Sequence, residues 1–275
     1  MHQNGWRHPD AAALIRSEMM SDEATVLTDE ADGVLVITIN RPEAKNAVNL
    51  SVAQGVAAAL ERLDSDDSLR VGVLTGAGGT FCAGMDLKAF VSGEFPQIEG
   101  RGFGGMTERS ADKPLIAAVE GYALAGGCEL AIACDLIVAA ENAKFGIPEV
   151  KRGLVAAAGG LVRLPSQIPY RVAMELALTG EFMGADRAMA MGLINELTEP
   201  GSALDTAKAL AQRIAENGPL AVKVSKAIIK ASRDWSDDEA WSNQNALTQP
   251  VFTSEDAIEG ATAFAEKRKP EWKGR

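Results

Sequence analysis

Histidine is nearly absent from this chain of 275 residues. The two histidines, His2 and His8, both lie within the first ten residues, ahead of any segment with the pattern of a packed element. Histidine is the usual acid or base near neutral pH and a common zinc ligand. Its absence from the body of the chain excludes Ser-His-Asp and Cys-His nucleophilic sites and histidine-built zinc sites. Any catalysis must therefore rest mainly on carboxylates and backbone N–H groups.

Cysteine and positive charge are also scarce. The three cysteines, Cys82, Cys128 and Cys134, form no Cys-x-x-Cys pair, which is typical of reduced thiols in a cytosolic protein. Lys and Arg number 27 against 38 Asp and Glu, so the net charge is −11. That balance argues against nucleic acid or an anionic membrane as a partner. We therefore expect a cytoplasmic protein.

Long apolar runs are missing as well. No segment approaches the roughly 20 apolar residues that a membrane-spanning helix needs. Residues 1–22 carry no apolar core of a signal peptide, and we expect them to form a flexible N-terminal extension. The composition, 47% hydrophobic and 24% charged, is that of a soluble globular protein.

What is present is an alternation of strands and helices up to about residue 200. Val34–Asn40, Val71–Leu74, Leu115–Val119 and Leu136–Ala139 have strand patterns, whereas Asn49–Leu63 and Gly126–Cys134 have helix patterns. We therefore expect an α/β core over residues 23–200 that carries the functional site.

Beyond residue 200 the pattern is helical only, so we expect an all-helical segment over residues 201–275. Ser202 with Asp205 and Ser236 with Glu239 have the spacing of capping boxes, and Ser254 is placed to begin a third helix. The intervening stretch 92–112 differs from both parts, because it holds five glycines and little periodicity. We expect it to be a mobile surface segment that helps to shape a ligand site.

Two glycine-marked loops attract attention first. Gly76 and Gly78 follow a strand as in a dinucleotide fingerprint, but Phe81 stands where the third glycine belongs, so we expect no nicotinamide cofactor. The following run, 83–88, is the stronger feature, because its small residues let the backbone approach a ligand. Its candidate substrate-binding residues are Ala83, Asp86, Leu87 and Lys88. The alternative is a tight strand-to-helix turn without function.

Gly126 and Gly127 begin a helix, so their N–H groups lie at the positive end of its dipole and can stabilise an oxyanion, and Gly127 is a further candidate substrate-binding residue. Glu129 follows in the first turn, within a stretch of small and apolar residues that predicts its burial. A buried carboxylate usually has a partner or a function. The alternative is a carboxylate that merely complements the helix dipole.

Glu149 directly follows Pro148, which restricts the backbone and suits a carboxylate held in position. This feature alone is weak, because Pro-Glu is common at helix starts. The glycine loops and the two glutamates together are far more specific than any one of them.

In that combination the chain resembles the enoyl-CoA hydratase/isomerase (crotonase) superfamily over residues 25–272. The motifs that carry the resemblance are Asn40-Arg-Pro, Gly78-Gly-x-Phe-Cys-Ala-Gly-Met-Asp-Leu-Lys88, Lys113-Pro-Leu-Ile-Ala-Ala-Val, Gly-Gly-Cys-Glu129-Leu, Phe145-Gly-Ile-Pro-Glu149 and Phe264-Ala-Glu-Lys-Arg268.

The resemblance implies a spiral of ββα units and a C-terminal helical segment that forms homotrimers or dimers of trimers. It implies that the N–H groups of Met85 and Gly126 form an oxyanion hole for an acyl-CoA thioester. Glu129 would activate water, and Glu149 would supply the proton to the α-carbon. The resemblance further implies that Lys88 and, from a neighbouring subunit, Lys267 bind coenzyme A, with no metal or redox cofactor.

The chain departs from the usual family pattern in two places. Many hydratases have Pro-Gly ahead of an Ala-Gly-Gly run, whereas this chain reads Ala156-Ala157-Ala158-Gly159-Gly160, and Ala125 replaces a common glycine. The added methyl groups are expected to crowd the water or the acyl chain. Met85 is bulkier than the alanine often found there and is expected to reshape the acyl pocket.

Three functions therefore remain open. The first is hydration of the 2,3 double bond of an enoyl-CoA. The second is another crotonase-type reaction, either double-bond isomerisation or a specialised acyl-CoA dehydration. The third is acyl-CoA binding without chemistry, which the presence of both glutamates disfavours.

Overall fold

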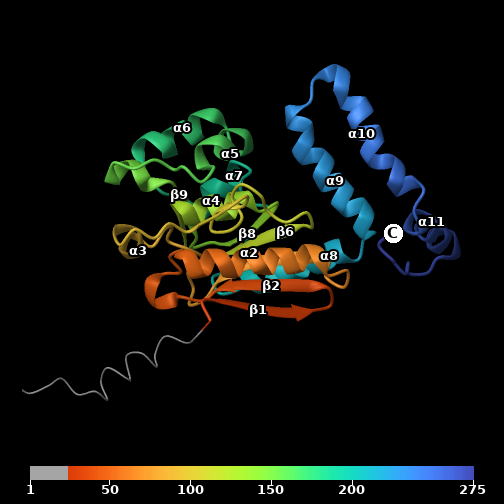
Figure 1. The fold of residues 1–275 in the computed structure, drawn as a ribbon, viewed down its shortest axis with the longest axis horizontal. Coiled ribbons are helices and arrows are strands. Elements are labelled where there is room, and N and C mark those ends of the chain that lie inside the picture. The colour runs from red at the N-terminus through yellow and green to blue at the C-terminus, as the bar shows by residue number, and fades with distance from the viewer. Residues whose placement is uncertain (1–23) are drawn as a thin grey trace, which may run out of the picture.

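The computed structural model describes residues 24–275, so the N-terminal extension expected over residues 1–22 lies outside the described residues. Figure 1 shows an α/β core from which the last helices extend to one side. None of the helices in the described range combines the length and the apolar character needed to cross a membrane.

The core is built on a six-stranded sheet with the order β1-β2-β3-β6-β8-β11. Its strands are β1 Val26–Ala31, β2 Val34–Ile39, β3 Val71–Gly76, β6 Leu115–Val119, β8 Leu136–Ala140 and β11 Glu196–Thr198. The pair β1–β2 is antiparallel, and all other neighbours are parallel. The four strands predicted from the sequence are thus confirmed to within two residues at each end.

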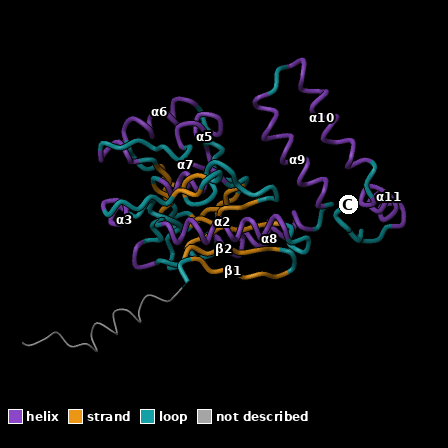
Figure 2. Tube along the Cα trace, viewed as in Figure 1, coloured by secondary structure: helices purple, strands orange, loops and turns teal. Residues whose placement is uncertain are grey.

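Alternation along the strands divides the apolar side chains between two cores, because successive residues point to opposite faces of a sheet. Leu35 and Ile37 of β2 join the larger core beneath helix α2 (Leu50–Ser65). Val34 and Val36 point the other way and pack with Ala207 and Ala211 of helix α8 (Ala203–Ala215). The two clusters place helices on both faces of the sheet, and Figure 2 shows α2 and α8 beside its strands.

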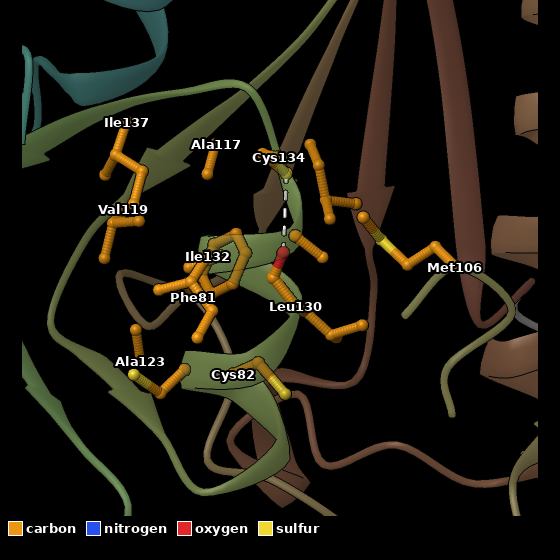
Figure 3. Packing of buried hydrophobic residues seen from close by; sticks show 14 of the residues in the cluster. Phe81, Cys82, Met106, Ala117, Val119, Ala123, Leu130, Ile132, Cys134 and Ile137 are labelled. Carbon is orange, nitrogen blue, oxygen red and sulfur yellow. Dashed lines mark hydrogen bonds between the residues drawn. The ribbon is translucent and has the colours of Figure 1, made fainter. Parts of the chain in front are cut away.

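A smaller sheet with the order β10-β9-β7 stands next to the main one. Its strands are β7 Tyr122–Leu124, β9 Lys144–Gly146 and β10 Met183–Gly184. Helix α4 (Gly126–Ala133) follows β7 and is buried along its whole length. Leu130 and Cys134 at its end pack among Phe81, Cys82 and Ile132 in the larger core (Figure 3). The core thus surrounds α4 and anchors it.

The remaining elements surround these sheets. They are η1 Pro42–Ala44, α3 Leu87–Val91, β4 Gln97–Ile98, β5 Gly102–Phe103, η2 Pro148–Arg152, α5 Gly160–Gln167, α6 Tyr170–Thr179 and α7 Ala185–Ala190.

After residue 200 every element of the described chain is helical: α8, α9 Pro219–Ala231, η3 Ser232–Asp234, α10 Asp237–Phe252 and α11 Glu255–Glu266. Helix α8 lies on the main sheet, whereas α9, α10 and α11 form an arm that projects from the core (Figure 1). We call these last three helices the C-terminal arm.

The predicted helix caps had mixed outcomes. Ser254 caps α11 by accepting the N–H of Ala257 at 3.0 Å, and the Glu239 carboxylate accepts the Ser236 N–H at 3.3 Å, as expected. The capping box at Ser202 was wrong, because the Ser202 side chain makes no capping bond. Glu120, distant in the sequence, accepts instead from the N–H groups of Gly201 and Ala203.

The interpretation of residues 92–112 as a surface segment was also wrong for its central part. Residues 101–107 are all buried, and Met106 belongs to the larger core. The glycines serve close packing: a Cβ atom on Gly105 would lie 2.3 Å from the carbonyl oxygen of Ala53 in α2. Only glycine can approach a helix backbone so closely.

Candidate active site

A cavity of about 370 Å³ lies beside the start of α4, and both Glu129 and Glu149 line it. Most of the remaining lining is apolar and comes from segments far apart in the sequence: Ala83, Met85, Leu87, Phe90, Gln97, Phe103, Leu124, Ala125, Gly126, Pro148, Arg152, Leu154, Val155, Ala157, Ala158 and Phe182. A mostly apolar pocket with few converging polar groups is the usual form of a small-molecule site.

One wall of the cavity consists of two turns that touch each other. An ideal Cβ atom on Gly84 would lie 2.8 Å from Ala125 Cβ and 3.3 Å from the backbone nitrogen of Gly126. Met85, which follows Gly84, and Gly126 both line the cavity. Neither of their N–H groups donates a hydrogen bond to the protein within residues 24–275. The pair therefore offers two free donors, which is the composition of an oxyanion hole.

The turn at Ala125 is held in an uncommon conformation, with φ 50° and ψ −129°. Residues that carry a side chain rarely adopt positive φ, and such strain costs on the order of 1–3 kcal/mol. The Ala125 N–H donates to the Gly146 carbonyl at 2.8 Å, and the Ala125 carbonyl accepts from the Glu129 N–H at 3.1 Å. These bonds hold the following N–H group, that of Gly126, in a fixed orientation.

Glu129 lies in the first turn of α4 and is only 2% exposed, so the predicted burial is confirmed. Its Oε1 accepts a hydrogen bond of 2.8 Å from the N–H of Gly160, the first residue of α5. Burial raises the pKa of Glu129, whereas the backbone donors Gly160 and Ala158 and the charge of Arg163 oppose that rise. Glu129 is thus a buried carboxylate whose ionised form is stabilised by two backbone N–H groups and one positive charge.

Glu149 lies in the 3₁₀ helix η2, directly after Pro148. Its Oε2 is buried and has no hydrogen-bond partner among the described residues. Burial, helped by the charge of Glu129, raises the pKa of Glu149 from 4.5 to about 7, against the opposing effects of its own backbone N–H and of Arg152. Two identical side chains in one cavity therefore differ in how readily they hold a proton, which is the condition for separate acid and base roles.

Comparison with known proteins agrees with this geometry. The sequence profile of the enoyl-CoA hydratase/isomerase family matches residues 29–275. A carnitinyl-CoA dehydratase of Proteus mirabilis is 42% identical over 250 residues, which cover 88% of this chain and 95% of that protein. The chain belongs to the enoyl-CoA hydratase/isomerase family.

Solved structures support the same assignment. An enoyl-CoA hydratase from Mycobacterium tuberculosis H37Rv is 62% identical, with a TM-score of 0.91 over 92% of this chain and 100% of that one. A carnitinyl-CoA dehydratase from Mycobacterium avium 104 is 48% identical, with a TM-score of 0.73 over the same shares. The chain therefore has the crotonase fold, with a helical C-terminal segment.

The other predicted substrate-binding residues of this crotonase-fold chain fall into two groups. Ala83 and Leu87 line the cavity, whereas Gly127, Asp86, Lys88 and Lys267 do not. Gly127 packs against the backbone, because a Cβ atom there would lie 2.1 Å from the Cys82 carbonyl oxygen. Lys88 and Lys267 are exposed, and their contact with coenzyme A stays a prediction.

Asp86 has a structural explanation. Its carboxylate accepts from the N–H groups of Lys88 and Ala89 at the start of α3, and it forms an ion pair with Arg41 at 2.9 Å. Burial would raise the pKa of Asp86, but the hydrogen bond and charge of Arg41 lower it overall. The side chain thereby fixes the loop that follows Met85.

Several lining residues were missed from the sequence. Phe103 comes from the buried part of 101–107, Phe182 from the loop before β10, and Arg152 from the end of η2. Their spacing along the chain carries no shared pattern, so only the fold brings them together. Ala157 and Ala158, where added methyl groups were expected to crowd the site, also line the cavity.

Proposed function

We propose that this chain is a hydro-lyase that adds water across the 2,3 double bond of an enoyl-CoA thioester. The observation that carries the proposal is the meeting of four groups in one cavity: two free N–H donors, from Met85 and Gly126, and two carboxylates of unequal proton affinity, Glu129 and Glu149. No metal or redox cofactor enters the proposed chemistry.

In this reaction the thioester carbonyl oxygen accepts hydrogen bonds from the Met85 and Gly126 N–H groups, which stabilise the enolate-like charge that forms on it. Loss of one such donor typically costs about 3–4 kcal/mol in barrier height. Glu129, in its ionised form, takes a proton from water while the water oxygen bonds to C3. Glu149, in its protonated form, delivers its proton to C2. The net change is addition of one water molecule.

Dehydration of a 3-hydroxyacyl-CoA is the same reaction in reverse, and the carnitinyl-CoA dehydratases among the relatives give it specific support. The carnitinyl group named for those relatives carries a quaternary ammonium. The cavity of this chain is mostly apolar, and both carboxylates in its lining, Glu129 and Glu149, are assigned to proton transfer rather than to holding a cation. We therefore propose an uncharged acyl group as the preferred substrate.

The quaternary structure belongs to the same proposal. Large apolar side chains stand exposed on the C-terminal arm, among them Trp241 at 72%, Phe252 at 80% and Phe264 at 88%. Apolar surface of this extent commonly marks a protein interface. We propose that the arm joins chains into a homotrimer or a dimer of trimers, and that Lys267 reaches the coenzyme A of a neighbouring subunit.

The decisive assay follows the loss of enoyl-thioester absorbance with short, long and ring-containing enoyl-CoAs, alongside the enoyl-CoA formed by dehydrating carnitinyl-CoA. Glu129→Gln and Glu149→Gln should each lower kcat on the order of 10²- to 10⁴-fold, because each removes one proton transfer. Glu141→Gln, at an exposed site, is the matched control. Tight acyl-CoA binding by the unaltered protein with no turnover would identify a binding protein instead.

A further inference from the structure

Arg163 lies one turn into α5 and connects two segments of the candidate site. Its Nη2 donates to the Thr107 carbonyl, and its Nη1 donates to the Ala158 carbonyl at 3.4 Å. Thr107 ends the buried stretch 101–107, which supplies Phe103 to the cavity, and Ala158 lines the cavity directly. One guanidinium group thus connects the buried stretch 101–107 with the turn that precedes α5.

The turn that Arg163 holds is the one that binds Glu129. Gly159 has φ 103°, and a Cβ atom there would lie 1.9 Å from Arg163 Nη1, so the guanidinium occupies the space of a side chain at this position. The next residue, Gly160, donates its N–H to Glu129 Oε1 at 2.8 Å. The backbone N–H of Arg163 also donates to the Gly159 carbonyl at 2.9 Å.

The positive charge of Arg163 supports the ionised form of Glu129, as does the hydrogen bond from Gly160. The titratable and charged groups around Glu129 are Arg163 from α5, Glu149 from η2 and its own neighbour Cys128. Arg163 is the only cation among them, and it forms no direct ion pair with Glu129 within the described residues. Arg163 therefore acts on Glu129 in two ways: it holds the turn that donates to Glu129, and its charge attracts the carboxylate at a distance.

We propose that Arg163 is a positioning residue for the base of the reaction: it fixes the turn 158–160 against Glu129 and favours the ionised form of that carboxylate. This inference rests on the proposed hydro-lyase function. The site needs Glu129 ionised and Glu149 protonated at the same time, and Arg163 is placed to favour that distribution.

The test compares Arg163→Gln and Arg163→Lys with the unaltered protein over a range of pH. For Arg163→Gln we expect kcat to fall on the order of 10- to 100-fold, as for a misplaced catalytic group. We also expect the acidic limb of the kcat/KM profile to move to higher pH, because Glu129 loses its neighbouring cation. Arg163→Lys keeps the positive charge but cannot donate to the Thr107 and Ala158 carbonyls at the same time. In this variant the acidic limb should lie at the pH of the unaltered protein, while kcat stays low.

Arg187→Gln is the matched control, since Arg187 forms an exposed ion pair with Glu175 away from the cavity. A merely structural role for Arg163 would lower the unfolding midpoint without moving the acidic limb, and that result overturns the proposal. If Arg163→Gln does not fold, Arg163→Lys decides: a lowered kcat at an unchanged unfolding midpoint supports the proposal, and an unchanged kcat overturns it.

A second readout separates this inference from the proposed function. The carboxyl carbon of Glu129, labelled with ¹³C and assigned with Glu129→Gln, can be titrated by NMR without substrate. A higher pKa of Glu129 in Arg163→Gln supports the positioning role even if no enoyl-CoA is turned over. An identical titration in both proteins overturns it even if the hydratase assay succeeds.

Discussion

Replacing Glu149 with glutamine should stabilise the folded protein by an amount that grows as pH rises from about 4.5 through about 7. Burial leaves one carboxylate oxygen without a partner and raises the pKa of Glu149 from 4.5 to about 7. A folded-state pKa above the unfolded value means that the folded protein binds this proton more tightly. The stabilisation is complete below pH 4.5 and disappears as pH rises through about 7. Glutamine cannot ionise, so the variant does not undergo this loss.

The size of the effect follows from the shift. One pKa unit corresponds to about 1.4 kcal/mol, so the rise from 4.5 to about 7 penalises the ionised form of Glu149 by at most about 3.5 kcal/mol. Because the carboxylate is partly exposed, solvent screening reduces this to roughly 1–2 kcal/mol. The free energy of unfolding of Glu149→Gln, relative to the unaltered protein, should therefore rise by roughly 1–2 kcal/mol between pH 5 and pH 8.5.

The assay is urea unfolding at fixed protein concentration across this pH range, with Glu141→Gln as the exposed control. Fixed concentration matters because subunit association contributes to apparent stability. A difference between Glu149→Gln and the unaltered protein that stays constant from pH 5 to pH 8.5 would refute the reasoning, whatever its sign. It would mean that Glu149 ionises as easily in the fold as in the unfolded chain.

Three further outcomes are expected. Hydration and dehydration, each measured as kcat/KM against pH, should fall together as pH rises through about 7, because both directions need the two glutamates to carry one proton between them and the pair loses that proton in this range. Gly127→Ala should lower stability by about 1–3 kcal/mol and reduce kcat, since its Cβ would lie 2.1 Å from the Cys82 carbonyl oxygen; Gly184→Ala, which meets nothing within 4 Å, should do neither in the same unfolding and kinetic assays. In sedimentation experiments the full chain should behave as three copies or a multiple of three, and Phe264→Asp on the arm should yield smaller species.

Strong local patterns predicted much of the sheet. Strands β2, β3, β6 and β8 are buried on both faces and rich in β-branched residues, so their sequences carry the signal directly. Strand β1 has the sequence VLTDEA and an exposed surface, and its pairing depends on β2 rather than on its own pattern. The three-residue strands β7 and β9 are too short for periodicity to reveal.

The structural role of glycine was the hardest to predict from the sequence. In the stretch 101–107 it was interpreted as a sign of mobility, whereas Gly105 permits contact with the backbone of α2. At Gly126 and Gly127 the same residue type was correctly interpreted as the start of a helix, because a helix pattern followed immediately. The contacts of Arg163 had no local signal at all, since Thr107 lies 56 residues away.

The two glutamates show why one cavity can serve both directions of a hydro-lyase reaction. Hydration begins with Glu129 ionised and Glu149 protonated, and it ends with the proton on Glu129. Dehydration starts from that second arrangement, so the active pair carries one proton in total in either direction. The backbone donor Gly160 supports the charge of Glu129, whereas Oε2 of Glu149 has no partner among the described residues. The resting proton therefore belongs on Glu149, which is the arrangement that adds water.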